Sequence, residues 1–448
     1  MNDNTLSSFL ESYAGSGTAR LHMPAHKGKP VIGCEEYDIT EIKGADYLYE
    51  GKGLIGESEK RMASLYGTGR TVYSTEGSSI CIKAMLGIIR TVSGRLRVLA
   101  GRNCHKAFID GCALLDGEVT WVYPEKRARS VCSSFITPAD IEIKLSEEDF
   151  DCVYITSPDY LGFMADIKGI SAVCRRHGVP LLVDNAHGAY LRFTEPDRHP
   201  ITLGADMCCD SAHKTLPCLT GTAMLHFSDS CPDTFQEDAK RIMSIFGSTS
   251  PSYLMLMSLD RCSLMLADGS LRKRIKETVR RVSLCRERIN ACGFSTVGDE
   301  PMKITVDASA SGMTGDALAD RLREHGIEPE YSDPLYTVLM PSAMTGEDDF
   351  SLIERAFSEI KADKGQVPEL PSPKPCEKIL SIREAMFAPC EEVPSDKASG
   401  RICARTITGC QPAVPIAVSG EMIDTDTIRL LKAYKIKSVF VTVKGENL

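Results

Sequence analysis

The chain has 448 residues, too many for one ordinary hydrophobic core, so two or three domains with a large buried interior are expected. Hydrophobic residues make up 43% of the sequence, charged residues make up 25%, and the mean hydropathy is −0.12, which together exclude a disordered or strongly biased chain. The formal net charge of −9 argues against nucleic acid and against an anionic membrane surface as partners, because both favour a basic face.

The 18 cysteines are scattered singly through apolar runs, which indicates reduced thiols and a cytoplasmic protein. The adjacent Cys208 and Cys209 cannot easily bridge, and no cysteine pairs have zinc-finger spacing, so no metal site is predicted. The first residues, MNDNTLSSFLESYAG, carry neither a basic nor an apolar signal region. No apolar run reaches the roughly eighteen residues of a membrane span. We therefore expect no targeting segment and no membrane partner.

Between residues 70 and 227, short apolar runs alternate with helical patterns, which predicts βαβ units and a mostly parallel sheet. The runs are apolar nearly throughout, as expected of strands that are buried on both faces. They are LRVLA (96–100), VTWVY (119–123), DCVYITS (151–157), VPLLVD (179–184) and TAMLHF (222–227). A helix between two of them, DIKGISAVCRRHG (166–178), is expected to end at Gly178.

The second half of the chain has a different pattern. Residues 252–292 read as a long helical stretch broken near Gly269, and an α+β pattern follows it. Strands are predicted at 302–307, 336–341 and 436–443, and helices at 315–326 and 345–365, the latter with Thr345 and Asp348 placed as a near capping box. A proline-rich linker is predicted at 364–376. The predicted domains are an N-terminal segment (1–50), a large domain (51–292) and a small α+β domain (293–448).

Residues just past the predicted strands carry reactive groups, and ligands of open parallel sheets bind there. Asp184 ends one strand, His105 follows another, and Gly77, Ser78 and Ser79 precede an apolar helix, where backbone N–H groups can hold a phosphate. Each also has a purely structural explanation: Asp184 as a helix cap, His105 as a packed side chain, and residues 77–79 as an ordinary helix cap. Lys214, in CDSAHKTLPCLTGTAMLH (209–226), is by itself most simply a solvated loop lysine.

Taken together these groups indicate one cofactor. Pyridoxal phosphate needs a lysine for a Schiff base, an acid for the pyridine nitrogen, a phosphate cup and a partner for the ring face. Lys214, Asp184, the 77–79 turn and His105 supply these four roles. The glycine patterns of dinucleotide and P-loop sites, GxGxxG and GxxxxGK[ST], do not occur.

Over nearly its whole length the chain resembles the pyridoxal-phosphate-dependent ornithine, lysine and arginine decarboxylases of the aspartate aminotransferase fold. The matching stretches are LHMPAHKG (21–28), EGSS (76–79), RNCHKA (102–107), TSPDYLG (156–162), VDNAHGAY (183–190), SAHKTLPCLTG (211–221), STSPSYLMLMSLD (248–260) and GE (420–421). The resemblance implies an α/β fold with a mostly parallel sheet in the large, cofactor-binding domain. It also implies a smaller α+β C-terminal domain and an N-terminal segment that contributes to the active site and the dimer.

The resemblance also implies a role for each matched residue. Lys214 would carry the cofactor as a Schiff base, Asp184 would pair with the pyridine nitrogen, and His105 and Ala186 would lie against the two ring faces. His187 would lie near the phenolic oxygen, with a purely structural role as the alternative. The implied phosphate contacts are Ser78, Ser79, Ser211 and His213, joined by Thr249 or Ser250 from the neighbouring subunit of a homodimer or higher oligomer.

The expected reaction is decarboxylation of a basic amino acid, with arginine or lysine ahead of ornithine as substrate, and with Lys214 or a neighbouring His returning a proton to the α-carbon. Glu330 could meet the distal cation of such a substrate, although a solvated carboxylate is the simpler interpretation. Two alternatives stay open. An aminotransferase would use Arg383, Arg401 or Arg405 to grip the α-carboxylate, and an inactive homologue would bind the cofactor without turnover.

The chain departs from the family pattern at several positions. Members usually carry Gly where Ala25 stands, Glu where Asn185 stands, His where Tyr190 stands and Gln where Gly221 stands. Residues 408–421 replace a more regular proline–glycine run. None of these departures removes a residue assigned to the cofactor, so substrate specificity is where we expect their effect. The early HMPAHK element further implies that the extra N-terminal domain of longer relatives is missing.

Overall fold

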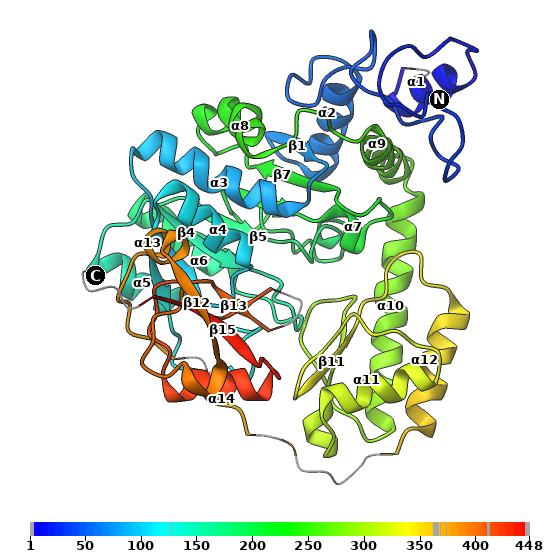
Figure 1. Cartoon of the computed structure of the whole chain (residues 1–448). Helices are drawn as coiled ribbons and strands as arrows, with labels where there is room; N and C mark the ends of the chain where they lie inside the picture. Colours follow the sequence, from blue (N-terminus) through cyan, green and yellow to red (C-terminus); the bar gives the residue numbers. More distant parts are fainter. Residues whose placement is uncertain are drawn as a thin grey trace. The chain divides into compact units, whose positions relative to one another are not determined.

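The computed structural model describes residues 4–126, 128–361, 367, 369–372, 374–409 and 413–443. The chain divides into two compact units (Figure 1). The first comprises Met1–Gly94 and Leu182–Lys276, and the second comprises Arg95–Leu181 and Glu277–Leu448. Each unit is described by itself below. The predicted domain boundaries at residues 50 and 292 remain a prediction.

The first unit contains strands in the order β1–β7–β6–β5. Strands β5 and β6 are parallel, while β7 runs antiparallel to both β6 and β1. Every residue of β5, β6 and β7 is buried, which agrees with their apolar composition. These strands are β1 (Arg70–Ser74), β5 (Leu181–Asp184), β6 (Met207–Asp210) and β7 (Ala223–Phe227).

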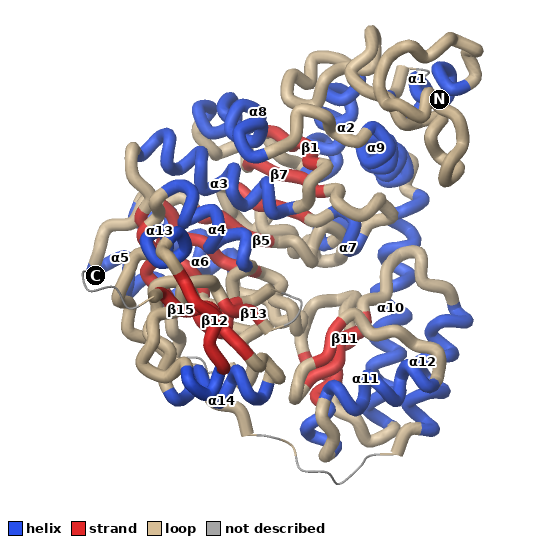
Figure 2. Tube along the Cα trace, viewed as in Figure 1, coloured by secondary structure: helices blue, strands red, loops and turns tan. Residues whose placement is uncertain are grey.

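Helices cover these strands and continue toward the N-terminus (Figures 1 and 2). Helix α3 packs against α8 and against β7, and α2 packs against β1 and α9, while α1 also lies on α9. The helices are α1 (Leu6–Ala14), α2 (Leu54–Tyr66), α3 (Ser78–Ser93), the single turn α7 (Ala212–Thr215), α8 (Asp233–Phe246) and α9 (Tyr253–Ala267). A 3-10 turn, η1 (Leu191–Phe193), follows β5.

Helix α10 (Ser270–Ala291) follows α9 after a break at Gly269, as the sequence predicts. At this position φ is +83°, a left-handed conformation that favours glycine.

The second unit begins with the parallel strands β4–β2–β3 and the helices between them. Helix α6 ends at Gly178 in the left-handed conformation, as predicted. These elements are β2 (Arg97–Gly101), α4 (Lys106–Leu115), β3 (Glu118–Val122), α5 (Pro138–Glu147), β4 (Cys152–Thr156) and α6 (Ile167–His177).

An antiparallel sheet in the order β10–β11–β9–β8 follows in the second unit. Side chains of this sheet and of α10, α11 and α12 form one hydrophobic core, which includes Val306, Leu318 and Phe357. The elements are β8 (Thr296–Val297), β9 (Ile304–Asp307), η2 (Ala308–Ser311), α11 (Gly315–Glu324), β10 (Tyr331–Ser332), β11 (Tyr336–Leu339) and α12 (Glu347–Glu359). The predicted cap of α12 was misplaced by one residue, because Gly346 precedes the helix and its N–H donates to Asp349 Oδ2 at 2.8 Å.

The C-terminal elements complete the second unit. They share a second hydrophobic core with β10 and β11, in which Val338 and Val441 are both fully buried. They are α13 (Ile382–Phe387), β12 (Cys390–Pro394), η3 (Ser395–Lys397), β13 (Ile407–Thr408), β14 (Pro415–Ala417), α14 (Thr425–Ala433) and β15 (Ser438–Thr442). Residues 364–366, 368 and 373 of the predicted linker, and 410–412 of the departing segment, lie outside the described residues. No described helix is long and apolar enough to cross a membrane.

Candidate active site

The predicted lysine lies in a short turn that is anchored at both ends to the sheet of the first unit. Ser211 follows the buried strand β6, and α7 carries His213 and Lys214 before the chain returns along β7. The backbone N–H of Lys214 donates to the Ser211 carbonyl at 3.1 Å. His213 Nδ1 donates to the Thr222 carbonyl at 2.8 Å, which leaves Nε2 as the acceptor of the neutral ring. The lysine backbone is therefore fixed on a rigid element.

The side chain of Lys214 is only partly exposed, and its Nζ lies 3.1 Å from His187 Nε2. His187 itself is buried, in the turn that follows β5. The contact joins the turn after β5 to the turn after β6, two strands that are parallel neighbours. An amine within hydrogen-bond distance of an imidazole can exchange a proton with it. The distance thus supports a chemical role for His187 besides its structural one.

Asp184 ends β5 and is 2% exposed. Its Oδ1 accepts from the Ala186 N–H at 3.2 Å and from the Cys209 thiol at 3.6 Å. The pKa of Cys209 is raised well above its ordinary value, mainly by burial and secondly by the negative charge of Asp184. This thiol therefore stays protonated and can donate. The carboxylate is held in place from two sides.

The predicted phosphate turn precedes α3. Gly77 has φ +74° and ψ 175°, a conformation that other residues rarely adopt, and no side chain caps the helix. Ser78 Oγ accepts from Ser211 Oγ at 2.9 Å, and the Gly77 N–H donates to the Gly221 carbonyl at 2.6 Å. These contacts join the turn to Ser211 and Gly221, the two ends of the segment 211–221 that carries Lys214. The first N–H groups of a helix have no partner inside it, so the arrangement can hold an anion.

Gly221, one of the positions where a departure from the family pattern is expected, has φ +95°. A Cβ at this position would lie 3.1 Å from Met255 Cε and 3.3 Å from the Thr75 carbonyl. Backbone strain and close packing therefore explain why glycine stands here in this chain.

Thr249 and Ser250 lie on an exposed loop between α8 and α9. The loop is tied to the phosphate turn because the Ser248 N–H donates to Glu76 Oε1 at 2.5 Å. Their exposure leaves them available to a neighbouring subunit, and their contact with its phosphate stays a prediction.

Two predicted residues belong to the second unit. His105 caps α4, and its Nδ1 accepts from the Ala107 N–H at 3.1 Å, which places the proton of the neutral ring on Nε2. Glu330 is exposed and accepts from the Tyr160 hydroxyl at 2.6 Å. The pKa of Tyr160 is raised well above its ordinary value, mainly by burial and secondly by the hydrogen bond with Glu330. The phenol therefore remains a donor. Both residues keep their sequence-based roles as predictions.

The structure adds a buried cluster that the sequence did not reveal. Asn185 Nδ2 donates to Asp210 Oδ1 at 2.6 Å, and His199 and His226 face the other oxygen of that carboxylate. Burial acts to raise the pKa of Asp210, but the two imidazoles outweigh it and hold this pKa below its ordinary value. Asp210 and His199 are fully buried in the first unit. Asn185, His199 and His226 come from separate segments of the chain, so no local sequence motif indicates that they meet at Asp210.

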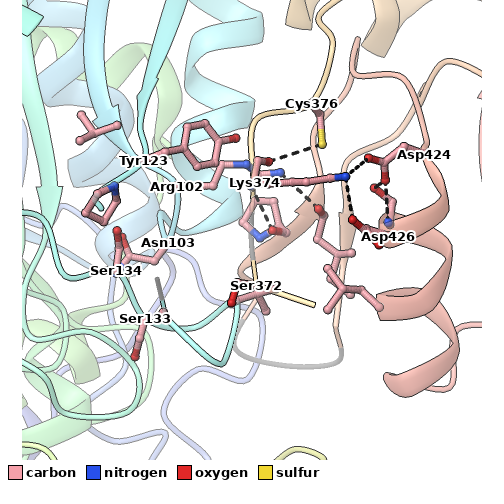
Figure 3. Close-up of a pocket in the computed structure, with 18 residues that line it drawn as sticks. Arg102, Asn103, Tyr123, Ser133, Ser134, Ser372, Lys374, Cys376, Asp424 and Asp426 are labelled. Atoms are coloured by element: carbon pink, nitrogen blue, oxygen red, sulfur yellow. Dashed lines mark hydrogen bonds and ion pairs between the residues drawn. The ribbon is translucent and has the colours of Figure 1, made fainter. Parts of the chain in front are cut away.

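A cavity in the second unit is lined by residues of β14 and α14, by the end of β3 with the loop that follows it, and by the loops around Arg102 and Lys374 (Figure 3). Two cations at its wall are already paired: Arg102 with Glu421 at 3.1 Å, and Lys374 with Asp426 at 2.6 Å. None of the residues predicted for the cofactor lines this cavity. Because its cations are neutralised by chain carboxylates, it does not offer a site for an anionic cofactor.

Comparison with known proteins gives a consistent result. The family model described as Orn/Lys/Arg decarboxylase, major domain, matches residues 19–304. The arginine decarboxylase of Halalkalibacterium halodurans is 29% identical, over 95% of this chain and 92% of the relative. The arginine decarboxylase of Bacillus subtilis is 27% identical, over 94% of this chain and 91% of the relative.

Among solved structures, the constitutive lysine decarboxylase of Escherichia coli is similar with a TM-score of 0.76 and 17% identity, over 98% of this chain and 82% of that one. At this identity the likeness shows the fold alone. The predicted fold is thereby confirmed: an α/β protein of the aspartate aminotransferase-like class with a mostly parallel sheet.

Proposed function

Because the chain belongs to the Orn/Lys/Arg decarboxylase family, we propose that it is a pyridoxal-phosphate-dependent enzyme that removes CO2 from a basic amino acid. The observation that carries the proposal is the cluster at the strand ends of the first unit. It combines a lysine amine 3.1 Å from His187, a buried carboxylate at Asp184 and two hydroxyl groups at the uncapped start of α3. These are the groups that the cofactor requires.

The residues present fit the cofactor, since each of its reactive parts has a partner of the right chemistry. Lys214 would hold the aldehyde carbon and Asp184 the pyridine nitrogen. The phosphate would be held by Ser78 and Ser79 at the start of α3 and by Ser211 and His213 from the turn that carries Lys214. When bound, pyridoxal phosphate supplies a sink for the electron pair that remains when CO2 leaves. Ala186 and, from the second unit, His105 are the proposed contacts of the two ring faces.

The chain's own groups then control charge and protons. A carboxylate at Asp184 favours positive charge on the nitrogen beside it. After CO2 departs, the α-carbon must receive one proton, and Lys214 is the proposed donor. His187 lies 3.1 Å from Lys214 Nζ and can replenish that proton. The two residues would thus act as one donor pair.

We place arginine first among substrates and lysine second. Four relatives that align over at least 91% of their own length are arginine decarboxylases, whereas the lysine decarboxylase of Pseudomonas aeruginosa aligns with 52% of this chain. Both substrates carry a distal cation, for which the exposed Glu330 is the proposed partner. The proposed assembly is a homodimer at least, in which Thr249 or Ser250 reaches the neighbouring site. A cytoplasmic location is supported by the scattered single cysteines.

The aminotransferase alternative is not favoured. Arg383 donates to the Ala113 carbonyl at 2.9 Å, and Arg401 pairs with Glu391 at 2.6 Å. Arg405 lies over the Phe440 ring, 3.9 Å from its centroid. Each of these candidate carboxylate-binding guanidinium groups therefore already has a partner in the chain.

The test is to incubate the purified enzyme separately with arginine, lysine and ornithine and to measure CO2 and the corresponding amine. We expect equal amounts of CO2 and amine, with the highest kcat/KM for arginine. Production of a keto acid without CO2 would establish the aminotransferase instead. Bound cofactor with no turnover of any of the three amino acids would establish the inactive homologue.

A further inference from the structure

A buried phenol of the second unit holds the carboxylate that is the proposed contact of the substrate's distal cation. Tyr160 Oη donates to Glu330 Oε1 at 2.6 Å, a hydrogen bond to a charged acceptor. The Glu330 side chain is exposed, whereas Tyr160 is only 9% exposed. The carboxylate therefore lies at the surface, and the group that binds it lies in the protein interior.

The backbone that carries the phenol is fixed by its own hydrogen bonds. Asp159 Oδ1 accepts from the Leu161 and Phe163 N–H groups, each at 2.9 Å, and so closes the turn that contains Tyr160. Lys303 Nζ donates to the Tyr160 carbonyl at 3.1 Å. These contacts come from both sides of residue 160, so its main chain has little freedom to move.

Glu330 is fixed at its backbone as well. Its N–H donates to the Val338 carbonyl of β11 at 2.9 Å, and Tyr331, the next residue, begins β10. The ring of Tyr331 meets that of Tyr160 edge-on, with centroids 5.1 Å apart and an interplanar angle of 78°. Because both partners are held in this way, the hydrogen bond between them restricts the rotation of the exposed carboxylate.

The negative charge of Glu330 has no partner cation within the part of the chain that the structure describes. Its neighbour Glu328, in contrast, pairs with Arg323 Nε at 2.9 Å. Each carboxylate oxygen can accept two hydrogen bonds, so Oε1 keeps one acceptor position beside Tyr160 and Oε2 keeps both. The carboxylate can therefore bind a cation while the phenol holds it.

The two candidate substrates make different demands on a carboxylate. A guanidinium is planar and binds best through two parallel N–H groups that lie in the plane of both oxygens. An ammonium is a compact charge with three rotatable donors, and one oxygen in any orientation is enough for it. Fixing the plane of the carboxylate therefore favours a guanidinium more than it favours an ammonium.

We propose that Tyr160 is a positioning residue that orients Glu330 for two parallel hydrogen bonds from a guanidinium, and thereby sets the preference for arginine over lysine. The inference rests on the proposed function, in which Glu330 contacts the distal cation. Without the phenol, the Glu330 side chain gains rotamer freedom that a bound guanidinium must remove again. Binding of arginine then weakens more than binding of lysine.

The test compares the cofactor-loaded wild type with Y160F, which removes the hydroxyl and keeps the ring. Rates of CO2 release are measured over a range of arginine and of lysine concentrations. Y160F should raise KM about tenfold for arginine and less than about threefold for lysine, with little change in either kcat. The matched control Y434F removes a phenol of the same hydrophobic region, whose hydroxyl lies 3.4 Å from Asp333 Oδ2, and should leave both KM values unchanged.

Two further measurements separate positioning from a general structural effect. Agmatine, the amine that arginine yields on loss of CO2, should bind about tenfold more weakly to Y160F than to the wild type in calorimetry. In an E330A background, adding Y160F should not raise the KM for arginine further, because the phenol acts only through the carboxylate.

The outcomes separate this inference from the proposed function. A wild type that releases no CO2 from arginine or lysine would refute the proposed function, and the inference with it. If the wild type is active, a Y160F enzyme with the wild-type ratio of the two KM values would overturn the inference alone. An equal effect of Y160F on the KM for arginine with and without Glu330 would also overturn it.

Discussion

Replacing Gly77 by alanine tests whether the turn before α3 holds the cofactor phosphate. At φ +74° and ψ 175° this residue occupies a region that is open essentially to glycine alone. The added Cβ would meet no atom closer than 3.9 Å, so crowding is not the problem and backbone strain is. The strain amounts to about 1–3 kcal/mol. The turn can relieve it only by rotating the peptide whose N–H donates to the Gly221 carbonyl.

Cofactor binding requires the native turn, so strain that is relieved in the empty protein must be restored when the phosphate binds. A strain of about 1.4 kcal/mol then weakens binding about tenfold. We expect G77A to raise the dissociation constant of pyridoxal phosphate by about that factor, measured by titrating cofactor-free enzyme and following visible absorbance.

The matched control lies at the other end of the same helix. Gly94 has φ +68° with no atom within 4 Å of an added Cβ, so G94A carries backbone strain of about 1–2 kcal/mol far from the turn. It should lower the free energy of unfolding in urea and leave cofactor binding unchanged. The reasoning fails if G77A binds the cofactor as tightly as G94A does.

Three further predictions follow from single residues. K214A should lose CO2 release and the visible absorbance of lysine-bound cofactor, and an unchanged spectrum would exclude Lys214 as the anchor. D184N should retain bound cofactor while kcat falls by about 100-fold or more, because a charge beside the ring nitrogen is lost. Burial raises the pKa of Asp159 to about 6 from 3.8, so its contribution to stability is complete below pH ~4 and is lost as the pH rises through 6. Relative to D159N, the wild type should lose about 3 kcal/mol between pH ~4 and ~7 in urea unfolding; a constant difference would contradict this.

Much of the fold was predictable because buried parallel strands have continuous apolar sequences. The runs that predicted β2, β3, β4, β5 and β7 all proved to be strands. The predicted break near Gly269 was also confirmed, because α9 ends before it and α10 begins after it. Strands β1 and β6 were missed. The run MCCD of β6 contains no β-branched or aromatic residue, and RTVYS of β1 is half polar, so neither stands out without its neighbours in the sheet.

The candidate active site was predictable in part, because strand ends gather reactive groups. Lys214 lies 3.1 Å from His187, and Ser211, three residues before Lys214, contacts Ser78 at the start of α3, while the role of each residue toward the cofactor stays a prediction. The cluster around Asp210 was not predictable. Its members become neighbours only through the antiparallel pairing of β6 with β7, which joins residues 18 positions apart such as Cys208 and His226.

The most direct test of the central claim is to find the lysine that carries the cofactor. Purified enzyme would be loaded with pyridoxal phosphate, reduced with borohydride, digested and analysed by mass spectrometry. The geometry of the strand-end cluster predicts that the reduced cofactor is attached to Lys214, within the peptide that contains Ser211 and His213. Attachment to a different lysine, or no attachment at all, would contradict the assignment of this site.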